Sequence, residues 1–416
     1  MLSLEYIRQN VDKVKKTLVL KNRQADVDLL LKLDEENKSL IAKINGLREE
    51  RNKLAKAKER SEALNKRGKE IKEELKVLEE KQTDAAEKVR AIQLSIPNIP
   101  YDEVPEGKSE ADNKEVKRVG EQTKFTFAPK SHIDLVKALD IADLERGVKV
   151  SGFRGYFLKG KLAMLHFALL WYVYQKMFKK GYIPLIAPSL VKEFTFFGNG
   201  QFPWGREEVY NLEKDDLYLA GTAEVPVTAY YANETLNEKD LPVKFYAFSP
   251  CFRREIGSYG KDTKGLYRVH EFAKVEQVII GAADDVKARE LHEELQKNVE
   301  EIITDLGLPY RVLLMCTGDM GEPQAKKYDT EVWMPCREGY GEAASNSIMT
   351  DYQARRLNIR YKDKEGNTKF AYTFNNTALA SPRILIAILE NCQQADGSVK
   401  VPQVLQALCG FTEISK

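Results

Sequence analysis

The sequence predicts an α+β protein in two parts. Residues 1–100 are expected to form an N-terminal antiparallel α-helical coiled-coil arm, and residues 101–416 a domain with a mostly antiparallel sheet flanked by helices. Three observations support this. The first 96 residues lack proline and carry two heptad runs. The segment Pro97-Asn98-Ile99-Pro100 then stops any helix. Beyond it, strand-like runs follow one another too closely for regular βαβ crossovers.

The arm is predicted from positions that alternate steps of three and four residues. The first run is Leu30, Leu33, Asn37, Leu40, Ile44, Leu47, Arg51 and Leu54. The second run is Leu64, Gly68, Ile71, Leu75, Leu78, Gln82, Ala85, Val89, Ile92 and Ile96. A polar stretch, residues 55–63, separates them, so a hairpin of two helices is the simplest fold. Runs of about 30 residues would give an arm roughly 45 Å long.

One end of the arm is rich in basic residues, which suggests phosphate contacts. These are Arg48, Arg51, Lys53, Lys56 and Lys58. Acidic residues lie among them, so the pattern indicates nucleic-acid binding only weakly. A dimerisation or spacer coil is the alternative, and it is the commoner use of coiled coils.

After Pro100, helix boundaries can be placed from capping residues. Residues 162–180 form an amphipathic helix that ends before Gly181, and a strand-like segment follows. Asp284 is expected to cap a second helix. Ser381 is expected to cap the last long helix, with Pro382 in its first turn and Arg383 placed to meet an anion. The expected strands are 243–248, 266–280, 310–315, 330–334 and 369–374.

The segment 251–276 carries the clearest functional pattern. It is expected to form two strands joined by a loop rich in Gly and Lys. Alternation places Arg253 and Glu255 on one face of the first strand. On the second strand the shared face holds Arg268, His270, Phe272, Lys274 and Glu276. Burying such a face is costly unless a ligand pairs with it. An anionic, partly aromatic ligand fits, and an exposed hairpin with solvated charges is the alternative.

Composition excludes several classes of protein. Charged residues are 31% of the 416, yet they nearly cancel to a net charge of +2. The five cysteines are scattered without a C-x-x-C pair, which argues against a disulfide framework or a zinc site. The start, MLSLEYIRQN, lacks an apolar leader, and no stretch approaches the ~20 apolar residues of a membrane span. We therefore expect a soluble, cytoplasmic protein with no membrane association.

Eight collinear motifs resemble one family. They are LREERNKL at 47–54, SIPNIP at 95–100, TAEV at 222–225, FRREIGSYGKDTKGLYRVHEF at 252–272, CTGDMG at 316–321, YDTEVWMP at 328–335, DYQARRLNIRY at 351–361 and AILEN at 387–391. The charged hairpin and the start of the last helix resemble motifs 2 and 3 of the class II aminoacyl-tRNA synthetases. The full set resembles the seryl-tRNA synthetases of the common bacterial type, over nearly the whole chain.

The resemblance implies activation of L-serine with ATP and its transfer to the 3′ end of tRNA(Ser). It assigns catalytic roles to Arg253, Glu255 and Arg383. The ATP-binding residues it implies are Arg253, Arg254, Glu255, Val269, His270, Glu271, Phe272, Glu342, Ala343, Ala344, Ser345 and Arg383. Within that set, Arg253 holds the α-phosphate and the serine carboxylate, Phe272 stacks on adenine, and Arg383 lies near the γ-phosphate. Glu342 and Ser345 would bind Mg²⁺ through oxygen ligands.

The resemblance also implies a serine pocket, a tRNA grip and a subunit interface. Serine would be bound by Thr222, Ala223, Glu224, Arg253, Glu276 and Thr377. Taken singly, Glu224 and Glu276 would be ordinary salt-bridge partners. The coiled-coil arm would hold the long variable arm of the tRNA, with the five basic residues named above as contacts. Pro188 would lie at the interface of a homodimer.

Some positions depart from the family pattern. They are Gly221, Glu271, Ala343, Ala344, Ile348, Asn376, Ala378 and Pro382. The charged site residues are retained, so we expect an active enzyme. An inactive paralogue acting as an RNA-binding protein is the main alternative. An amino-acid ligase that loads a carrier protein is disfavoured by the long arm and the lack of a zinc site, and a purely structural coiled coil by the polar strand face. The sequence leaves open whether tRNA(Sec) is a substrate, and how well threonine and glycine are rejected.

Overall fold

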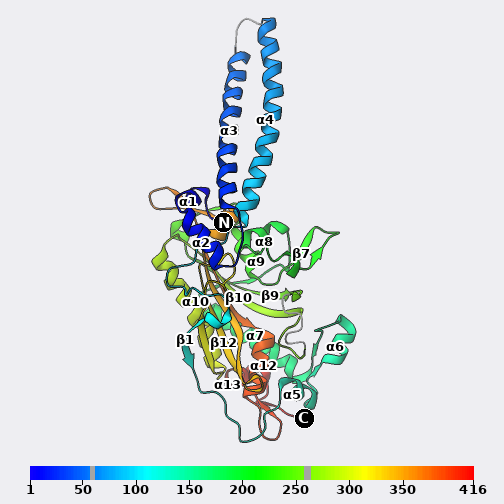
Figure 1. Cartoon of the computed structure of the whole chain (residues 1–416). Helices are drawn as coiled ribbons and strands as arrows, with labels where there is room; N and C mark the ends of the chain where they lie inside the picture. The colour runs from blue at the N-terminus through cyan, green and yellow to red at the C-terminus, as the bar shows by residue number, and fades with distance from the viewer. Residues whose placement is uncertain (57–60, 257–263) are drawn as a thin grey trace. The chain divides into compact units, whose positions relative to one another are not determined.

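A computed structural model describes residues 1–56, 61–256 and 264–416 of the chain (Figure 1). The chain divides into two compact units, Met1–Pro97 and Asn98–Lys416. Among the described residues, no helix combines the length and apolar character needed to cross a bilayer. All five cysteines are free thiols.

The first unit consists of two short helices and a long helical pair. The helices are α1 (Leu4–Gln9), α2 (Val11–Leu20), α3 (Val27–Ala55) and α4 (Glu62–Leu94). Helices α3 and α4 lie side by side over most of their length (Figure 1), which confirms the predicted antiparallel pair. Their seam buries Ile44, Ile71 and Leu75. Two polar heptad positions also meet, since the Gln82 amide donates to Asn37 Oδ1 at 3.1 Å.

An eight-stranded sheet forms the centre of the second unit. Its order is β1 (Lys114–Val119), β11 (Tyr310–Leu314), β12 (Lys326–Met334), β13 (Gly339–Thr350), β16 (Tyr372–Ala380), β10 (Glu271–Gly281), β9 (Val243–Phe252) and β4 (Ile183–Ile186). Every neighbouring pair is antiparallel except β4 with β9. This confirms the predicted mostly antiparallel sheet.

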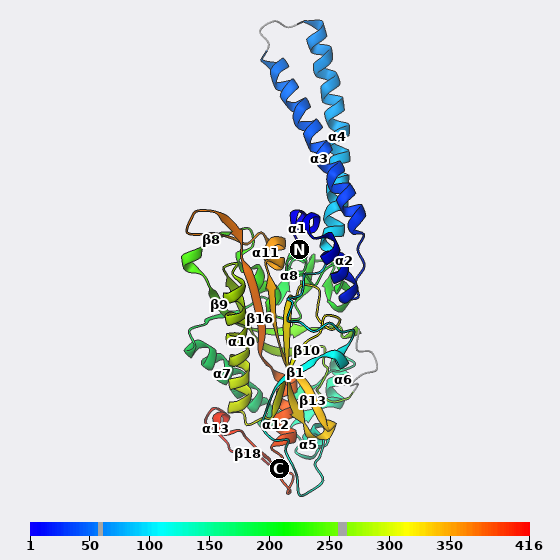
Figure 2. The same cartoon turned by 60° about the vertical axis from the view of Figure 1, so that its left-hand side comes forward.

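Helices pack on this sheet and enclose the main apolar core. The principal ones are α7 (Gly160–Lys179), α10 (Asp285–Asp305), α12 (Ser381–Asn391) and α13 (Gln403–Cys409). Figure 2 shows α10 running alongside β16, which it contacts. Asn376 of β16 donates to Leu295 O of α10 at 2.8 Å, whereas its neighbour Thr377 contacts Glu276. Because successive strand residues face opposite sides, Thr377 and Glu276 lie on the face away from α10.

Smaller elements surround the sheet. The helices are α5 (His132–Ala138), α6 (Leu144–Ser151), α8 (Glu193–Asn199), α9 (Glu224–Thr228) and α11 (Tyr352–Leu357). The strands are β2 (Ala142–Asp143), β3 (Phe157–Leu158), β5 (Leu190–Val191), β6 (Asn211–Leu212), β7 (Leu217–Leu219), β8 (Thr235–Asn237), β14 (Arg360–Lys362), β15 (Thr368–Phe370), β17 (Val399–Lys400) and β18 (Glu413–Ile414). The 3-10 turns are η1 (Glu110–Asp112), η2 (Arg206–Glu208), η3 (Ala229–Tyr231), η4 (Glu238–Asp240) and η6 (Pro335–Arg337).

Most predicted helix ends are confirmed, with one correction. Helix α7 ends where predicted, and Gly181 after it has a positive φ of 81°. The Asp284 carboxylate accepts from the Val286 and Lys287 amides, as a cap should. The prediction that Ser381 caps α12 is wrong. Ser381 is the first helical residue, Ala380 is the cap position, and the Ser381 hydroxyl pairs with His166 Nδ1 at 2.8 Å.

The strand limits of the charged hairpin also differ from the prediction. Strand β9 ends at Phe252, so Arg253 and Glu255 lie beyond it. Strand β10 begins only at Glu271, so Arg268 and His270 precede it rather than sharing its face. The predicted strand 369–374 is divided between β15 and β16. Glu255 has a left-handed φ of 55° and Gly265 one of 75°, and both turn the chain in a way that alternation cannot reveal.

Candidate active site

A pocket of about 530 Å³ opens on the sheet face away from α10. It is lined by Arg253, Glu255, Tyr267, Arg268, Val269, Phe272, Lys274, Glu342, Ala343, Ala344, Thr377, Ala380, Pro382 and Arg383. Nine of these are residues assigned to the site from sequence. Residues separated by 130 positions of the chain therefore converge on one cavity.

Two arginines dominate one end of the pocket. Arg253 follows β9, donates through Nε to Gly221 O at 3.1 Å, and has its guanidinium 5.2 Å from the centre of the Phe272 ring. Arg383 lies in the first turn of α12, and its Nη1 donates to the Glu342 backbone oxygen at 2.8 Å and to Oε2 at 3.1 Å. Two guanidinium groups beside an aromatic ring are suited to bind a ligand that carries both phosphate and an aromatic ring.

Glu342 is a carboxylate held among cations. Burial alone would raise its pKa, but the charges of Arg383, Lys327 and Arg253 outweigh burial and lower the pKa to about 2. It is therefore ionised throughout the physiological range. Glu342 lies on β13, two residues before Ala344, which lines the same wall of the pocket.

Glu255 is fixed by two arginines. Its Oε2 lies 3.3 Å from Arg268 Nη1 and 3.8 Å from Arg154 Nη1. The left-handed backbone at Glu255 costs on the order of 1–3 kcal/mol, and these ion pairs hold the residue in that conformation. Arg154 is buried, follows α6, and was missed by sequence analysis. The only sequence indication was its own position in a Gly-rich turn, 152–155.

Buried charges gather near the other end of the pocket. Lys274 and Glu276 are 4% and 2% exposed, and Nζ lies 2.5 Å from Oε2. Lys274 Nζ also donates to the Thr222 hydroxyl at 2.6 Å, and the Thr377 hydroxyl donates to Glu276 Oε2 at 3.3 Å. Glu276 and Thr377 meet because they are directly paired in the β10–β16 register. Lys274 was placed on the polar face from sequence but was given no role there.

Glu224 lies near this group at the start of α9. The side-chain amides of Gln353 and Asn375 each donate to its Oε1 at 2.9 Å. Burial, followed by the negative charge of Glu276, raises the pKa of Glu224 to about 7. Ala223 beside it is fully buried and supplies backbone rather than a functional side chain.

Several assigned residues do not line the pocket. Arg254 lies instead in a separate surface hollow with Arg206 and Tyr210. His270 contacts Arg253 O at 2.9 Å through Nδ1 and lies edge-on to Phe153 and Tyr210. Glu271 is exposed, and because it precedes Phe272 on β10 its side chain points away from the ring-bearing face. The departure at Glu271 therefore places no side chain in the cavity.

The structure also shows where Ser345 and the other residues that depart from the family pattern lie. Ser345 pairs with Asp329 across β13 and β12, and Asp329 in turn lies 2.9 Å from Lys327 Nζ. Burial raises the pKa of Asp329 to about 6. Asn376 and Ala378 alternate with Thr377 and so face away from the pocket, and Ile348 is buried in the core. Pro382, Ala343 and Ala344 do line the cavity.

The described part of the chain holds no cluster of three or more His, Cys, Asp or Glu side chains that could bind a metal ion. Of the two residues assigned to Mg²⁺, only Glu342 lines the pocket. A metal ion there would need most of its ligands from a bound phosphate or from water.

The basic residues assigned to the arm are exposed where the structure describes them, and two of them form ion pairs within the arm. Arg48 pairs with Glu79 at 2.8 Å and Lys53 with Glu49 at 2.7 Å, and all four side chains are largely exposed. Arg51 and Lys56 are exposed too. Lys58 lies outside the described residues. These exposed ion pairs contribute little to stability.

An exposed apolar surface runs along α7 and β4. Its members are Met164, Phe167, Trp171, Phe178, Ile183 and Ile186, each about half exposed or more. Pro188, assigned to a subunit interface, is exposed just beyond β4. Contiguous apolar residues on this scale mark a protein–protein contact more often than free surface.

Comparison with known proteins identifies the family. The model of the tRNA synthetase class II core domain (G, H, P, S and T) matches residues 208–392, so the pocket belongs to a class II aminoacyl-tRNA synthetase core. The seryl-tRNA synthetase N-terminal domain model matches residues 1–100. A serine–tRNA ligase of Deinococcus radiodurans is 42% identical over 100% of this chain and 99% of its own length. One from Bdellovibrio bacteriovorus is 45% identical over 97% and 96%.

Solved structures agree with these matches. Seryl-tRNA synthetase of Pyrococcus horikoshii, crystallised with ATP, superposes with a TM-score of 0.92 at 38% identity, covering 100% of this chain and 99% of that one. The cytoplasmic serine–tRNA ligase of Naegleria fowleri in complex with AMP gives 0.86 at 33%, covering 99% and 97%. The chain belongs to the seryl-tRNA synthetase family.

Proposed function

We propose that this chain is a serine–tRNA ligase that activates L-serine with ATP to seryl-adenylate and then transfers serine to the 3′ end of tRNA(Ser). One observation carries the proposal: a pocket with two arginines and an aromatic ring at one end adjoins a buried Lys–Glu–Thr group at the other. The first end suits a nucleoside triphosphate. The second suits a small molecule with both an ammonium and a hydroxyl.

The first reaction is a displacement at phosphorus. A carboxylate oxygen of serine attacks the α-phosphorus of ATP, the bond from that phosphorus to the bridging oxygen breaks, and pyrophosphate leaves with the electron pair. Arg253 would bind both the attacking carboxylate and the α-phosphate, and Phe272, whose ring centre lies 5.2 Å from the Arg253 guanidinium, would stack on adenine. Arg383 would neutralise the leaving pyrophosphate. Catalysis then rests on positioning and charge stabilisation.

Serine selection is assigned to the buried group. The Glu276 carboxylate and the Thr377 hydroxyl would bind the hydroxyl of serine, and the Thr222–Glu224 segment would hold its ammonium. A pocket built to hydrogen-bond a hydroxyl rejects alanine strongly, because buried polar groups would otherwise remain unsatisfied. It rejects glycine for the same reason.

Mg²⁺ fits the pocket as a partner of ATP. Glu342 is ionised and offers hard oxygen ligands, which suits a cation that keeps several waters and binds through one or two carboxylates plus phosphates. Glu342, with Ser345 behind it, would hold the ion. When bound, it would neutralise phosphate charge. Glu342 must first exchange its contact with Arg383 for the ion.

The helical pair of residues 1–100 is proposed as the tRNA grip, and residues 101–416 as the catalytic domain. Arg48, Arg51, Lys53 and Lys56 expose cations on the arm, and Lys58 belongs to the same basic segment. An A-form RNA arm is recognised by shape and backbone, which exposed cations suit. Deleting residues 34–94 should abolish tRNA charging while leaving serine-dependent pyrophosphate exchange. Unchanged charging would refute the grip.

The exposed apolar surface of α7 and β4 is proposed as the interface of a homodimer, with Pro188 at its edge. A twofold dimer uses the same patch on both subunits, so one self-complementary apolar surface is sufficient. The five free thiols support a reducing compartment, and we propose the cytoplasm.

The test is serine-dependent ATP–pyrophosphate exchange. Arg253→Ala should abolish exchange, and Glu276→Ala should abolish the preference for serine over alanine. If wild-type protein folds but shows no exchange, the alternative of an inactive RNA-binding paralogue is favoured. Wild-type behaviour in both variants would refute the site assignment.

A further inference from the structure

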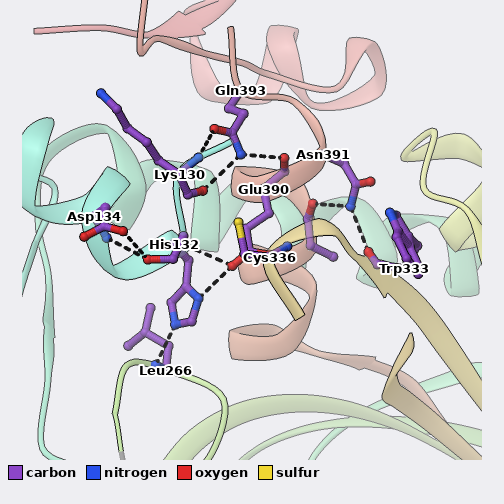
Figure 3. Close-up of polar contacts among 11 residues, drawn as sticks. Lys130, His132, Asp134, Leu266, Trp333, Cys336, Glu390, Asn391 and Gln393 are labelled. Atoms are coloured by element: carbon purple, nitrogen blue, oxygen red, sulfur yellow. Dashed lines mark hydrogen bonds and ion pairs between the residues drawn. The ribbon is translucent and has the colours of Figure 1, made fainter. Parts of the chain in front are cut away.

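A buried histidine–glutamate pair lies beyond the pocket, where α5 meets the end of α12 (Figure 3). His132 Nδ1 is 2.9 Å from Glu390 Oε1, and the two side chains are 12% and 2% exposed. The same Glu390 oxygen accepts the His132 backbone amide at 3.0 Å, and Oε2 accepts the Cys336 amide at 3.1 Å. Burial raises the pKa of Glu390, but these donors outweigh it and lower the pKa below its usual range. Glu390 is thus a buried, fully engaged carboxylate.

The second ring nitrogen of His132, Nε2, contacts the backbone of the segment that precedes β10. The Leu266 backbone amide donates to His132 Nε2 at 3.3 Å (Figure 3). Nε2 must therefore be the acceptor, and the ring proton must lie on Nδ1, where it is donated to Glu390. The carboxylate fixes the tautomer, and the tautomer fixes the acceptor. No other arrangement of one ring proton satisfies both contacts.

Gly265 allows this close approach. Its φ is 75°, and a Cβ built on it would lie 2.2 Å from His132 Nε2 and 2.9 Å from Ile133 Cγ1. Any side chain at this position would therefore displace the imidazole ring, apart from the left-handed backbone that glycine tolerates best. The position of the His132 ring therefore requires glycine at residue 265.

Tyr267, the residue after Leu266, connects the His132 contact to the pocket. Tyr267 O accepts from Arg383 Nε at 3.3 Å, and the Arg383 guanidinium lies 4.5 Å from the Tyr267 ring centre. The Arg337 guanidinium lies 4.1 Å from the same ring. Arg337 shares the η6 turn with Cys336, whose amide is held by Glu390. The Glu390 carboxylate thus holds the η6 turn through the Cys336 amide and also holds the His132 ring that accepts the Leu266 amide.

We propose that His132 is a positioning residue for the nucleotide end of the pocket: by accepting the Leu266 amide it fixes Gly265–Tyr267, and through Tyr267 it aims Arg383. This inference rests on the proposed function, because Arg383 is assigned to the triphosphate there. His132 does not line the pocket and touches no assigned serine ligand. Its loss should therefore weaken ATP binding and spare serine binding.

Two substitutions separate the two ring nitrogens. In His132→Asn the amide nitrogen can occupy the Nδ1 position and keep the Glu390 contact, but nothing reaches Leu266. In His132→Gln the longer side chain can place its oxygen near the Nε2 position and restore the acceptor. Losing one hydrogen bond to a buried amide corresponds to roughly 3- to 10-fold in affinity. We expect His132→Asn to raise KM for ATP by about that factor with KM for serine within about twofold, and His132→Gln to recover at least half of the loss.

The measurements are both KM values in pyrophosphate exchange and the Kd of ATP for the full chain by calorimetry without serine. Gly265→Ala is the second perturbation, and it should raise KM and Kd for ATP by displacing the ring. An unchanged Kd in folded His132→Asn, or equal changes in KM for ATP and serine, would overturn the proposal. If His132→Asn fails to fold, an unchanged Kd in Gly265→Ala would overturn it. Wild-type protein that binds ATP without exchange would contradict the proposed function alone.

Discussion

The buried ion pair of Lys274 and Glu276 gives the sharpest prediction of stability. Lys274→Met keeps the length of the side chain but leaves Glu276 as a buried carboxylate without its positive partner, beside the Thr377 hydroxyl that donates to it at 3.3 Å. Removing one partner of a buried pair typically costs about 3–5 kcal/mol, because the other charge stays desolvated. The Thr222 hydroxyl also loses the hydrogen bond from Nζ, which adds on the order of 1 kcal/mol. We expect about 4–6 kcal/mol in total.

The matched control is Lys159→Met. Lys159 pairs with Asp140 in the same unit, but its side chain is 39% exposed and that of Asp140 is 80% exposed. Such a pair contributes about 0–1 kcal/mol. The difference between the two lysine variants therefore reports burial rather than the loss of a positive charge.

Urea unfolding followed by tryptophan fluorescence measures both variants. Trp171, Trp204 and Trp333 are the only tryptophans in the chain and all lie in the second unit, so the signal reports on the unit that holds the pair. The double variant Lys274→Met/Glu276→Leu should recover most of the lost stability, because an apolar pair of similar volume can replace a buried ion pair. Equal, small losses in both lysine variants would refute the reasoning.

Three further predictions concern the pocket and the surface. The pKa of Glu224 is raised to about 7, so below that pH its side chain is neutral and cannot pair with an ammonium. We therefore expect kcat/KM for serine to rise with pH and to level off above about 7. Glu224→Gln should lack this rise. Arg383→Lys should raise KM for ATP at least about tenfold in pyrophosphate exchange, because a lysine ammonium cannot donate two parallel hydrogen bonds to phosphate while a separate Nε–H keeps the contact to Tyr267 O. Phe167→Glu should turn a dimer into a monomer in light scattering, with an unchanged mass contradicting the proposed interface.

Sequence periodicity was sufficient to predict the long antiparallel helical pair. The heptad runs end within two residues of the ends of α3 and α4, and the polar positions Asn37 and Gln82 form a contact across the seam. The Asp284 cap was equally readable, because a carboxylate before an amphipathic run has few other roles. The prediction that Ser381 caps α12 was wrong because its hydroxyl pairs with His166, a tertiary contact that no local sequence pattern could reveal.

Sequence predicted nine of the fourteen residues that line the pocket, but it did not predict the backbone that carries them. Arg253, Phe272 and Arg383 do meet in one cavity, although Arg253 lies outside the strand that was expected to present it. The left-handed residue Glu255 breaks the alternation on which that expectation depended. Arg154 could not be found by pattern, because its contact with Glu255 joins positions about one hundred residues apart.

The charges of the pocket are largely paired with one another in the free chain, and this constrains how substrates enter. Arg383 is held by Glu342, Lys274 by Glu276, and Glu255 by arginines. On the proposed function, a triphosphate must offer Arg383 more negative charge than one carboxylate does, and its three phosphates would supply that excess. If Arg383 turned to phosphate, the Glu342 carboxylate would lose its main positive partner while facing the same ligand, which would disfavour the complex unless a cation accompanied the nucleotide. On the proposed function, this pairing would favour a metal-bound triphosphate over the nucleotide alone, and phosphate and water would supply most of the metal's ligands because the described residues hold no preformed metal cluster.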